Sequence, residues 1–313
     1  MPRTKPPRLR AGATFGVVAS SSPVFEQTTA RRGVRRLEQA GYRVRFLPHA
    51  RDRIGYLAGS AADRAADLHA AFADPAIDAV LQLRGGYGAG QLLPLLDVDL
   101  LRANPKPFVG FSDTTMLHVA LGQRAGLVTF WGPALAALGR ASAYTWERFV
   151  HALTAPTTPS TVGPHPDDPW VATLTGGMAE GDLVGGTTSL LAATLGTPWE
   201  IDTAGRILLL EDVNEEPYRV DRLLTQLAQA GKLAAAAGIV VAEHAGVRPR
   251  GSFPGGSLSL DDVLDALVRP LGVPAVHGLP LGHGRHLATV PLGVAARLDA
   301  DAGRLTILDP GLV

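Results

Sequence analysis

"PFVGFSDTTMLHVALGQRAGLVTFWGP", residues 107–133, contains two β-rich runs with a helical pattern between them. The first run ends at a polar turn, and the apolar residues that follow it recur at helical spacing. The second run begins at residue 127, after a glycine that ends the helical pattern. A strand, a helix of ten or more residues and a second strand predict parallel strands joined by a crossover helix.

The same alternation extends over residues 12–150 and predicts an α/β fold, a parallel sheet with helices on both faces. Its other β-rich runs are 13–20, 42–48 and 77–86, and its other helical patterns are 25–41 and 61–74. Ligands of such sheets bind beyond the carboxyl ends of the strands. The polar segments "RGGYG" (84–88) and "GFSD" (110–113) are both predicted to lie there.

A proline-rich segment separates this half from a second, more β-rich half. Residues 154–170 hold five prolines and show little periodicity, which is typical of a boundary between domains. We therefore predict an N-terminal domain over 1–153, a linker over 154–172 and a C-terminal domain over 173–313. Residues 293–309 have the pattern of a terminal β-hairpin.

The amino-acid composition excludes several classes of binding partner and of active-site chemistry for this protein. Lysine plus arginine and aspartate plus glutamate both number 29 in the 313 residues, so we expect no nucleic-acid or anionic-membrane partner. The absence of cysteine excludes disulfides, thiolate metal ligands and a cysteine nucleophile. We see no secretory signal and no apolar run long enough to span a membrane, and therefore expect a cytoplasmic protein.

Ser112 has two local interpretations. Gly110 stands two residues before it, as in the strand–turn–helix elbows that present a nucleophilic serine. The N–H of Asp113 would then lie at a helix start, where a developing oxyanion is favoured. The glycine that usually follows two residues after the serine is Thr114 here. Ser112 or Asp113 is also a good helix N-cap, and this stretch alone favours the cap over the nucleophile.

The glycine-rich run "RGGYGAG", residues 84–90, also allows two roles. Its spacing fits neither a Walker A loop nor the G-x-G-x-x-G dinucleotide motif. A bare backbone N–H in this loop would complete an oxyanion hole if the loop lay beside a second strand end. The alternative is a tight turn between a strand and a helix, for which glycine is equally suited.

A serine nucleophile needs a base and a carboxylate that orients it. His283 lies in a Gly/Pro-rich loop, where an accessible imidazole is expected. Glu211 ends an apolar strand and is our preferred orienting carboxylate, whereas Glu215 or Glu216 is the alternative and more typical of a helix cap. His286 would form a metal pair with His283, but no suitable carboxylates or H-E-x-x-H motif accompany it, so we predict no metal site.

Six separated segments together resemble the LD-carboxypeptidases, serine peptidases of bacterial cell-wall recycling. They follow in the family's order and are 56–97, 104–121, 127–133, 181–199, 207–231 and 282–293. The resemblance implies a catalytic triad of Ser112, Glu211 and His283, with the backbone N–H groups of Asp113 and Gly86 as the oxyanion hole. It implies no cofactor.

The resemblance also implies an architecture and a substrate. The N-terminal domain would resemble class I glutamine amidotransferases, the C-terminal domain would be smaller and β-rich, and the protein would form a homodimer. The substrate would be a murein tetrapeptide, as the free peptide, a muropeptide or a UDP-linked form, from which terminal D-alanine is released. Substrate contacts are expected at Arg84, Gly85 and Tyr87.

Two departures and two alternatives accompany this resemblance. Trp131 stands where many members have histidine, and residues 284–290 lack the commoner asparagine. A branch of the same family gives immunity to microcin by cutting a toxic peptidyl or aminoacyl nucleotide, and it is the alternative enzyme function. A non-catalytic small-molecule binding module is the alternative from another class, and it would be expected to lack a triad residue.

Overall fold

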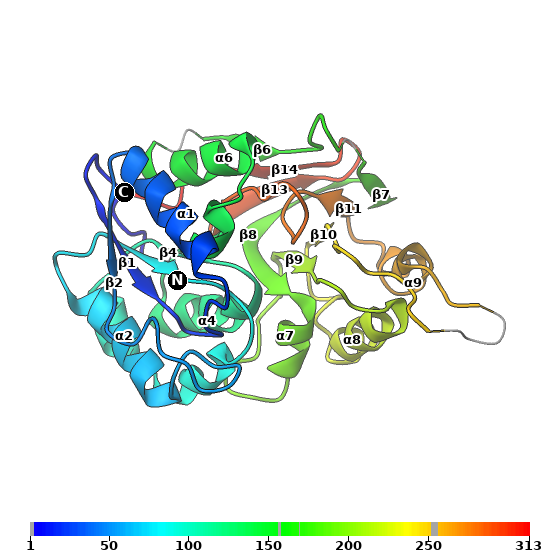
Figure 1. Ribbon diagram of the computed structural model, residues 1–313. Helices are drawn as coiled ribbons and strands as arrows, with labels where there is room; N and C mark the ends of the chain where they lie inside the picture. Colours follow the sequence, from blue (N-terminus) through cyan, green and yellow to red (C-terminus); the bar gives the residue numbers. More distant parts are fainter. Residues whose placement is uncertain (1–2, 156–157, 169, 252–255) are drawn as a thin grey trace. The chain divides into compact units, whose positions relative to one another are not determined.

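The computed structural model describes residues 3–155, 158–168, 170–251 and 256–313 (Figure 1). The chain divides into two units, each with its own sheet. The first unit comprises Met1–Pro156, Thr289–Gly293 and Gly311–Val313, and the second comprises Thr157–Ala288 and Val294–Pro310. The domain boundaries expected from the sequence stay a prediction. No helix in the described ranges combines the length and the apolar character needed to cross a membrane.

The first unit is built on a six-stranded sheet with the order β12-β5-β4-β3-β1-β2. Strands β1 to β5 are parallel, as the alternation of strands and helices predicts, and β12 is antiparallel to β5. The sequence does not predict β12, because it contains Pro291 and a proline is tolerated in a strand mainly at a sheet edge. The strands are β1 Thr14–Val18, β2 Arg43–Phe46, β3 Ala79–Gln82, β4 Phe108–Gly110, β5 Thr129–Trp131 and β12 Val290–Leu292.

The direction of the chain across this sheet reverses at β1. The chain passes from β1 to β2 on one side and then returns past β1 to β3. Because such crossovers are right-handed, α1 (Gln27–Gln39) and α2 (Ala61–Ala73) cover opposite faces of the sheet, as Figure 1 shows. The carboxyl edge between β1 and β3 is therefore the point at which open α/β sheets bind ligands.

The helices of the first unit follow local signals in the sequence. α2 begins where the Ser60 hydroxyl accepts a hydrogen bond from the Asp63 N–H, and it ends shortly before Pro75. α1 packs closely on α5, since a Cβ on Gly33 would clash with the Leu135 carbonyl. The remaining helices are α3 Val98–Ala103, α4 Thr115–Ala120, α5 Leu135–Leu138 and α6 Ala143–Thr154.

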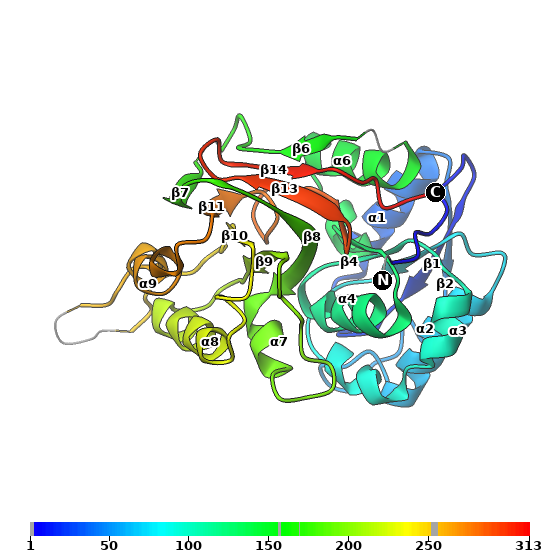
Figure 2. The ribbon, with the colours of Figure 1, turned by 180° about the vertical axis from the view of Figure 1, so that it is seen from behind.

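The second unit contains an eight-stranded mixed sheet with the order β6-β14-β13-β8-β9-β10-β11-β7. Its strands β8 to β11 are parallel, and β13 and β14 form the predicted terminal hairpin. β6 lies within the proline-rich segment and pairs with β14, as Figure 2 shows. The strands are β6 Ser160–Val162, β7 Ala172–Thr175, β8 Met178–Thr187, β9 Ile207–Glu211, β10 Gly238–Ala242, β11 Ala275–Leu279, β13 Ala295–Asp299 and β14 Arg304–Ile307.

The core of the second unit lies at its parallel strands. Every residue of β9, β10 and β11 is buried, which explains why these strands read as continuous apolar runs rather than as alternating patterns. The helices are α7 Thr188–Ala193, α8 Pro217–Gln229 and α9 Leu260–Leu267. Glu211, the last residue of β9, is the one carboxylate in these three strands, and it is fully buried.

Candidate active site

Ser112 occupies a sharp turn directly after β4. Its φ angle is +64°, a left-handed conformation that costs a non-glycine residue roughly 1–3 kcal/mol. The turn needs a glycine before it, since a Cβ on Gly110 would lie 2.7 Å from Gln82 Cγ. Ser112 begins a single turn of 3₁₀ helix whose N-cap position is Phe111, and no side chain caps it. The alternative that Ser112 is a helix N-cap is therefore wrong.

Two threonines hold this turn closed. The Thr114 hydroxyl donates to the Phe111 carbonyl at 2.9 Å, and the Thr115 hydroxyl donates to the Ser112 carbonyl at 2.7 Å. Thr114 stands where the general elbow has glycine, but its side chain reinforces the turn instead of blocking it. The departure from the general elbow pattern is thus compatible with the strained serine.

The glycine-rich loop approaches Ser112 closely. A Cβ on Gly85 would lie 2.8 Å from Ser112 Cβ, so only glycine allows this approach. Gly86 has a φ angle of +122°, and a Cβ there would clash with the Ser22 hydroxyl. That hydroxyl accepts a hydrogen bond from the Tyr87 N–H at 3.0 Å. The loop is thus more than a turn between a strand and a helix, because its backbone lies beside the serine.

Asp113 joins the serine turn to the same loop. Its carboxylate is 3% exposed and accepts a hydrogen bond from the Ala89 N–H at 2.8 Å. Burial raises the pKa of Asp113, while the nearby charge of Arg64 opposes the rise. Asp113 is therefore not an N-cap but a buried link between the two segments. The oxyanion roles of the Asp113 and Gly86 N–H groups stay predictions.

Arg64, which no motif in the sequence indicates, is hydrogen-bonded to the glycine-rich loop at Gly88. Its guanidinium, which is 1% exposed, donates to the carbonyls of Ser20 and Gly88 at 2.6 and 2.9 Å, and to Gln91 Oε1 at 2.6 Å. A buried arginine that is fully hydrogen-bonded holds three chain segments at fixed distances. An arginine inside the apolar pattern of α2 was the only sequence signal for this role.

Arg84 and Tyr87 flank the glycine loop. Arg84 donates to the Pro23 carbonyl at 3.3 Å and lies over the Phe25 ring at 5.2 Å, and burial lowers the pKa of its guanidinium. Tyr87 is 69% exposed and meets Tyr56 edge to face. These placements leave the substrate-binding roles of Arg84, Gly85 and Tyr87 as predictions.

In the second unit, a buried carboxylate orients the His283 imidazole. Glu211 Oε2 accepts a hydrogen bond from His283 Nδ1 at 2.6 Å, and the Thr187 hydroxyl donates to Glu211 Oε1. The side chain of Glu211 is fully buried, whereas that of His283 is 17% exposed. With Nδ1 as the donor, Nε2 is left as the acceptor, which is the tautomer of a general base. Thr187, like Arg64, has a role that no motif in the sequence indicates.

The two alternative carboxylates have other partners. Glu215 forms an ion pair with Arg219, one turn along the chain, at 3.6 Å. Glu216 occupies the N-cap position of α8, and its Oε2 accepts a hydrogen bond from the Arg250 N–H at 3.2 Å. Neither contact is that of a carboxylate orienting an imidazole, so Glu211 is the better orienting group.

Glu243 shapes the loop that carries His283. A Cβ on Gly282 would clash with the Glu243 carbonyl, and a Cβ on Gly284 would clash with the Glu243 carboxylate. Burial, assisted by the negative charge of Asp168, raises the pKa of Glu243 to about 7. Its Oε2 is buried and accepts no hydrogen bond from a described residue. The signal in the sequence was a carboxylate directly after a buried strand, one position later than Glu211, which ends its strand.

Two further histidines have local partners. His118 is buried in α4 between the Thr129 hydroxyl at 2.8 Å and the Gly110 carbonyl at 2.9 Å, and burial lowers its pKa to about 4. His286 groups with His165 and Asp167, not with His283. The rings of His286 and His165 stack at 3.6 Å with planes 16° apart, so their in-plane lone pairs do not converge as metal ligands do.

Comparison with known proteins finds matches to both halves of the chain. Residues 15–132 match the model of the LD-carboxypeptidase N-terminal domain, and residues 180–298 match that of the LD-carboxypeptidase C-terminal domain. A probable murein peptide carboxypeptidase of Bacillus subtilis is 38% identical over 98% of this chain and 95% of its own length.

Two solved structures resemble the whole chain. The structure of muramoyltetrapeptide carboxypeptidase from Oxalobacter formigenes has a TM-score of 0.83 and 32% identity, and the match covers 95% of this chain and 99% of that one. The microcin C7 self-immunity protein MccF, a protein known from Escherichia coli, has a TM-score of 0.90 and 26% identity, with 99% and 100% covered. With both of its halves matched by the family's models, this chain belongs to the LD-carboxypeptidase family.

Proposed function

We propose that the protein is a serine-type LD-carboxypeptidase that releases terminal D-alanine from murein tetrapeptides. The observation that carries this proposal is the hydrogen bond between the buried Glu211 carboxylate and His283 Nδ1, in a chain that also holds Ser112 in a left-handed turn. An oriented imidazole and a presented serine are the components of acyl transfer by nucleophilic catalysis.

In the proposed mechanism, Ser112, Glu211 and His283 act as a triad. His283 Nε2 takes the proton of the Ser112 hydroxyl while the oxygen attacks the scissile carbonyl. Glu211 stabilises the positive charge that the imidazole gains, and the N–H groups of Asp113 and Gly86 stabilise the oxyanion. His283 then protonates the departing amine of D-alanine, and a water molecule hydrolyses the acyl-enzyme by the reverse proton path.

The surroundings of each group suit these steps. The full burial of Glu211 and its second hydrogen bond from Thr187 keep the carboxylate in one orientation. The positive φ of Ser112, with Gly85 packed against it, gives the hydroxyl a fixed place beside the loop. Preorganisation of this kind lowers the barrier because little reorganisation is left for the reaction itself.

Several finer features belong to the same proposal. Arg84, Gly85 and Tyr87 contact the substrate, and the protein acts as a cytoplasmic homodimer on free, muropeptide or UDP-linked forms of the tetrapeptide. The nucleophile belongs to an N-terminal domain that resembles class I glutamine amidotransferases, and Glu211 and His283 belong to the C-terminal domain. The match of separate family models to residues 15–132 and 180–298 supports this division.

The test is alanine release from a murein tetrapeptide, followed by mass. The wild type should release D-alanine, and Ser112→Ala should lower turnover by several orders of magnitude. Glu211→Gln should collapse turnover, whereas Glu215→Gln, at the ion pair with Arg219, should change it less than about twofold. Full activity of Ser112→Ala, or equal losses in the two glutamine variants, would contradict the proposed triad.

A second candidate function is hydrolysis of a toxic peptidyl or aminoacyl nucleotide. The TM-score of 0.90 to the microcin C7 self-immunity protein favours it. That protein has been solved in complex with aspartyl sulfamoyl adenosine, which is therefore the substrate for the test. Cleavage of this compound with a kcat/KM above that for murein tetrapeptide would make the immunity function the main one.

A further inference from the structure

The first unit contains an arginine-lined pocket away from the serine turn. Its volume is about 440 Å³, and it is bounded by the first half of α1, by the segment that follows β2 and by residues that follow β1 and β3. This size is within the range of pockets that hold small molecules. We call this cavity the arginine pocket, and its four arginines are Arg31, Arg35, Arg51 and Arg53.

The charge of the arginine pocket is unbalanced. Four guanidinium groups line it and no carboxylate does, although the whole chain has equal numbers of basic and acidic residues. Within the described ranges, none of these four side chains forms a hydrogen bond or ion pair, in contrast to Arg64, whose guanidinium donates three hydrogen bonds to neighbouring segments. Four guanidinium groups around a concave space, with no carboxylate in its lining, favour an anionic ligand.

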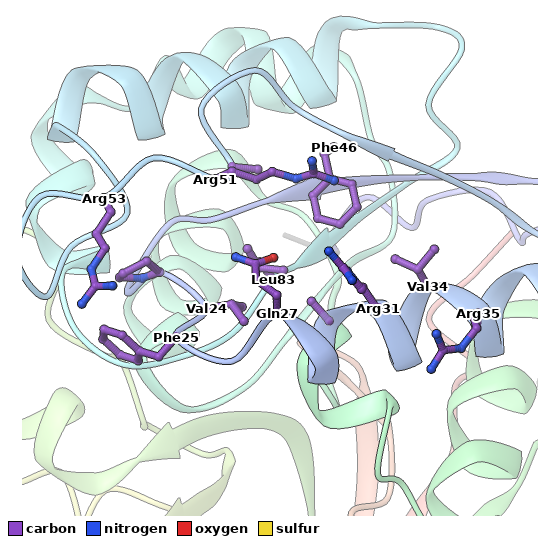
Figure 3. A pocket seen from close by; sticks show the side chains of 13 residues that line it. Val24, Phe25, Gln27, Arg31, Val34, Arg35, Phe46, Arg51, Arg53 and Leu83 are labelled. Carbon is purple, nitrogen blue, oxygen red and sulfur yellow. The ribbon is translucent and has the colours of Figure 1, made fainter.

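Aromatic rings hold two of these arginines in place. Arg51 lies over the Phe46 ring at 4.6 Å, and Arg53 lies over the Phe25 ring at 5.0 Å. Stacking uses the flat face of a guanidinium and leaves its N–H groups, which point outward in the plane, free to bind an oxyanion. Figure 3 shows Arg31 and Arg51 extending from opposite walls toward the middle of the pocket, with Arg53 beside Phe25.

The position of the pocket in the fold agrees with ligand binding. It lies at the carboxyl edge of the sheet, next to the reversal at β1 where open α/β sheets bind ligands. α1 begins at the pocket with Gln27, and the carboxylate of its N-cap residue, Glu26, is paired with Arg140 rather than with an arginine of the pocket.

We propose that the arginine pocket is a binding site for a small phosphorylated molecule. A diphosphate concentrates two or more negative charges in a group that two guanidinium forks can grip from opposite walls. The apolar side chains of Val24, Val34 and Leu83 would contact the organic remainder of the ligand.

The proposal also concerns the substrate, and there it rests on the proposed function. Phe25 contacts both Arg53 of the pocket and Arg84, and Arg84 is followed by Gly85, which packs against Ser112. The pocket lies beyond β1 and β2, so it is roughly 10–15 Å from the end of β4 at the usual spacing of strands. The phosphate therefore belongs either to the far end of a UDP-linked tetrapeptide or to a separate phosphate ester.

Calorimetric titration with inorganic pyrophosphate tests the pocket without relying on activity. The wild type should bind it saturably, with one site per chain, and Arg31→Ala/Arg51→Ala should weaken binding about tenfold or more. The control is Arg222→Ala/Arg304→Ala, which removes the same charge outside the pocket and should shift the affinity less than about threefold. Equal weakening in both double variants, or no saturable binding by the wild type, would overturn the proposal.

Kinetics with two substrates distinguish the sources of the phosphate. If it belongs to the substrate, the ratio of kcat/KM for UDP-linked over free tetrapeptide should fall about tenfold in Arg31→Ala/Arg51→Ala, and stay unchanged in the control. If it belongs to a separate ester, the ratio stays constant in both variants while pyrophosphate still binds the wild type. If the wild type binds pyrophosphate but releases no alanine, the binding site stands and the proposed function is refuted. If the wild type releases alanine but does not bind pyrophosphate, the proposed function stands and the binding site is refuted.

Discussion

The serine turn of the first unit and the histidine loop of the second both depend on glycine, but for different physical reasons. At the serine turn, the loop residues Gly86 and Gly88 have positive φ angles, and Gly85 is needed for close approach to Ser112. At the histidine loop, Gly282 and Gly284 have no such φ angle and are required only because Glu243 fills the space beside them. The serine turn and its glycine loop thus depend on unusual backbone angles and close approach. The histidine loop depends only on the space that Glu243 leaves beside it.

The largest effect should come from the strained segment. Gly85→Ala would place a Cβ against Ser112 Cβ and displace the nucleophile, so turnover should fall roughly 10²-fold. The matched control is Gly90→Ala in the same loop, whose Cβ would meet only the flexible end of Met116. Turnover of both variants on murein tetrapeptide checks the prediction. Equal losses would contradict it, because any substitution in this loop would then lower turnover regardless of contact with Ser112.

The histidine loop should respond to its neighbour. Gly284→Ala clashes with the Glu243 carboxylate and should lower turnover about 30-fold. Glu243→Ala should restore most of this loss in the double variant, because it removes the obstructing group. Gly282→Ala meets the Glu243 backbone instead, so the same second substitution should not rescue it. A double-mutant cycle on kcat measures the difference, and rescue of both glycine variants would contradict it.

A smaller effect is expected at the carboxylate that orients His283. Thr187→Val removes one of the hydrogen bonds to Glu211 and should lower kcat about tenfold while KM stays within twofold. Thr188→Val is the control, since the Thr188 hydroxyl donates to the backbone carbonyl of Glu211 and not to its carboxylate. If the control loses as much kcat as Thr187→Val, the carboxylate hydrogen bond has no special role.

The smallest effect concerns Glu243 and pH. Its pKa is about 7 in the folded protein and near 4.5 ordinarily, so the folded state keeps a proton that the unfolded chain releases. Stability of the wild type should therefore decline from about pH 4.5 to pH 7, and Glu243→Gln should be spared this decline. The variant should gain on the order of 1 kcal/mol over the wild type between pH 4.5 and 8 in urea unfolding. A difference in the free energy of unfolding between Glu243→Gln and the wild type that does not change with pH would contradict this prediction.

Much of this fold follows from the sequence, because its main signals are local. The helix at residues 61–73 has a serine cap and a proline stop, and the buried strands at 207–211 and 238–242 are continuous apolar runs. Strand β12 escapes prediction because its pairing partner is about 160 residues away and its short run contains a proline. No local pattern indicates such a pairing.

The candidate site is predictable to a similar extent. Ser112 follows a strand, Glu211 ends one and His283 lies in a glycine-rich loop, and each is a residue type with obvious chemistry. Thr187 and Arg64 are not predictable, because their roles depend on partners in other segments, Glu211 for the first and Ser20 and Gly88 for the second. The arginine pocket has the same character, since its arginines come from two segments that only the folded sheet brings together.

Because strand β12 is translated late, the sheet of the first unit is completed late in synthesis. The sheet that carries Ser112 gains its last strand from residues 290–292, which are translated only after His283. Until then β5 has an open edge, which is a site for mispairing with other nascent chains. A growing chain thus cannot complete the serine sheet before it also contains the histidine, and translation that stops early leaves that edge unpaired.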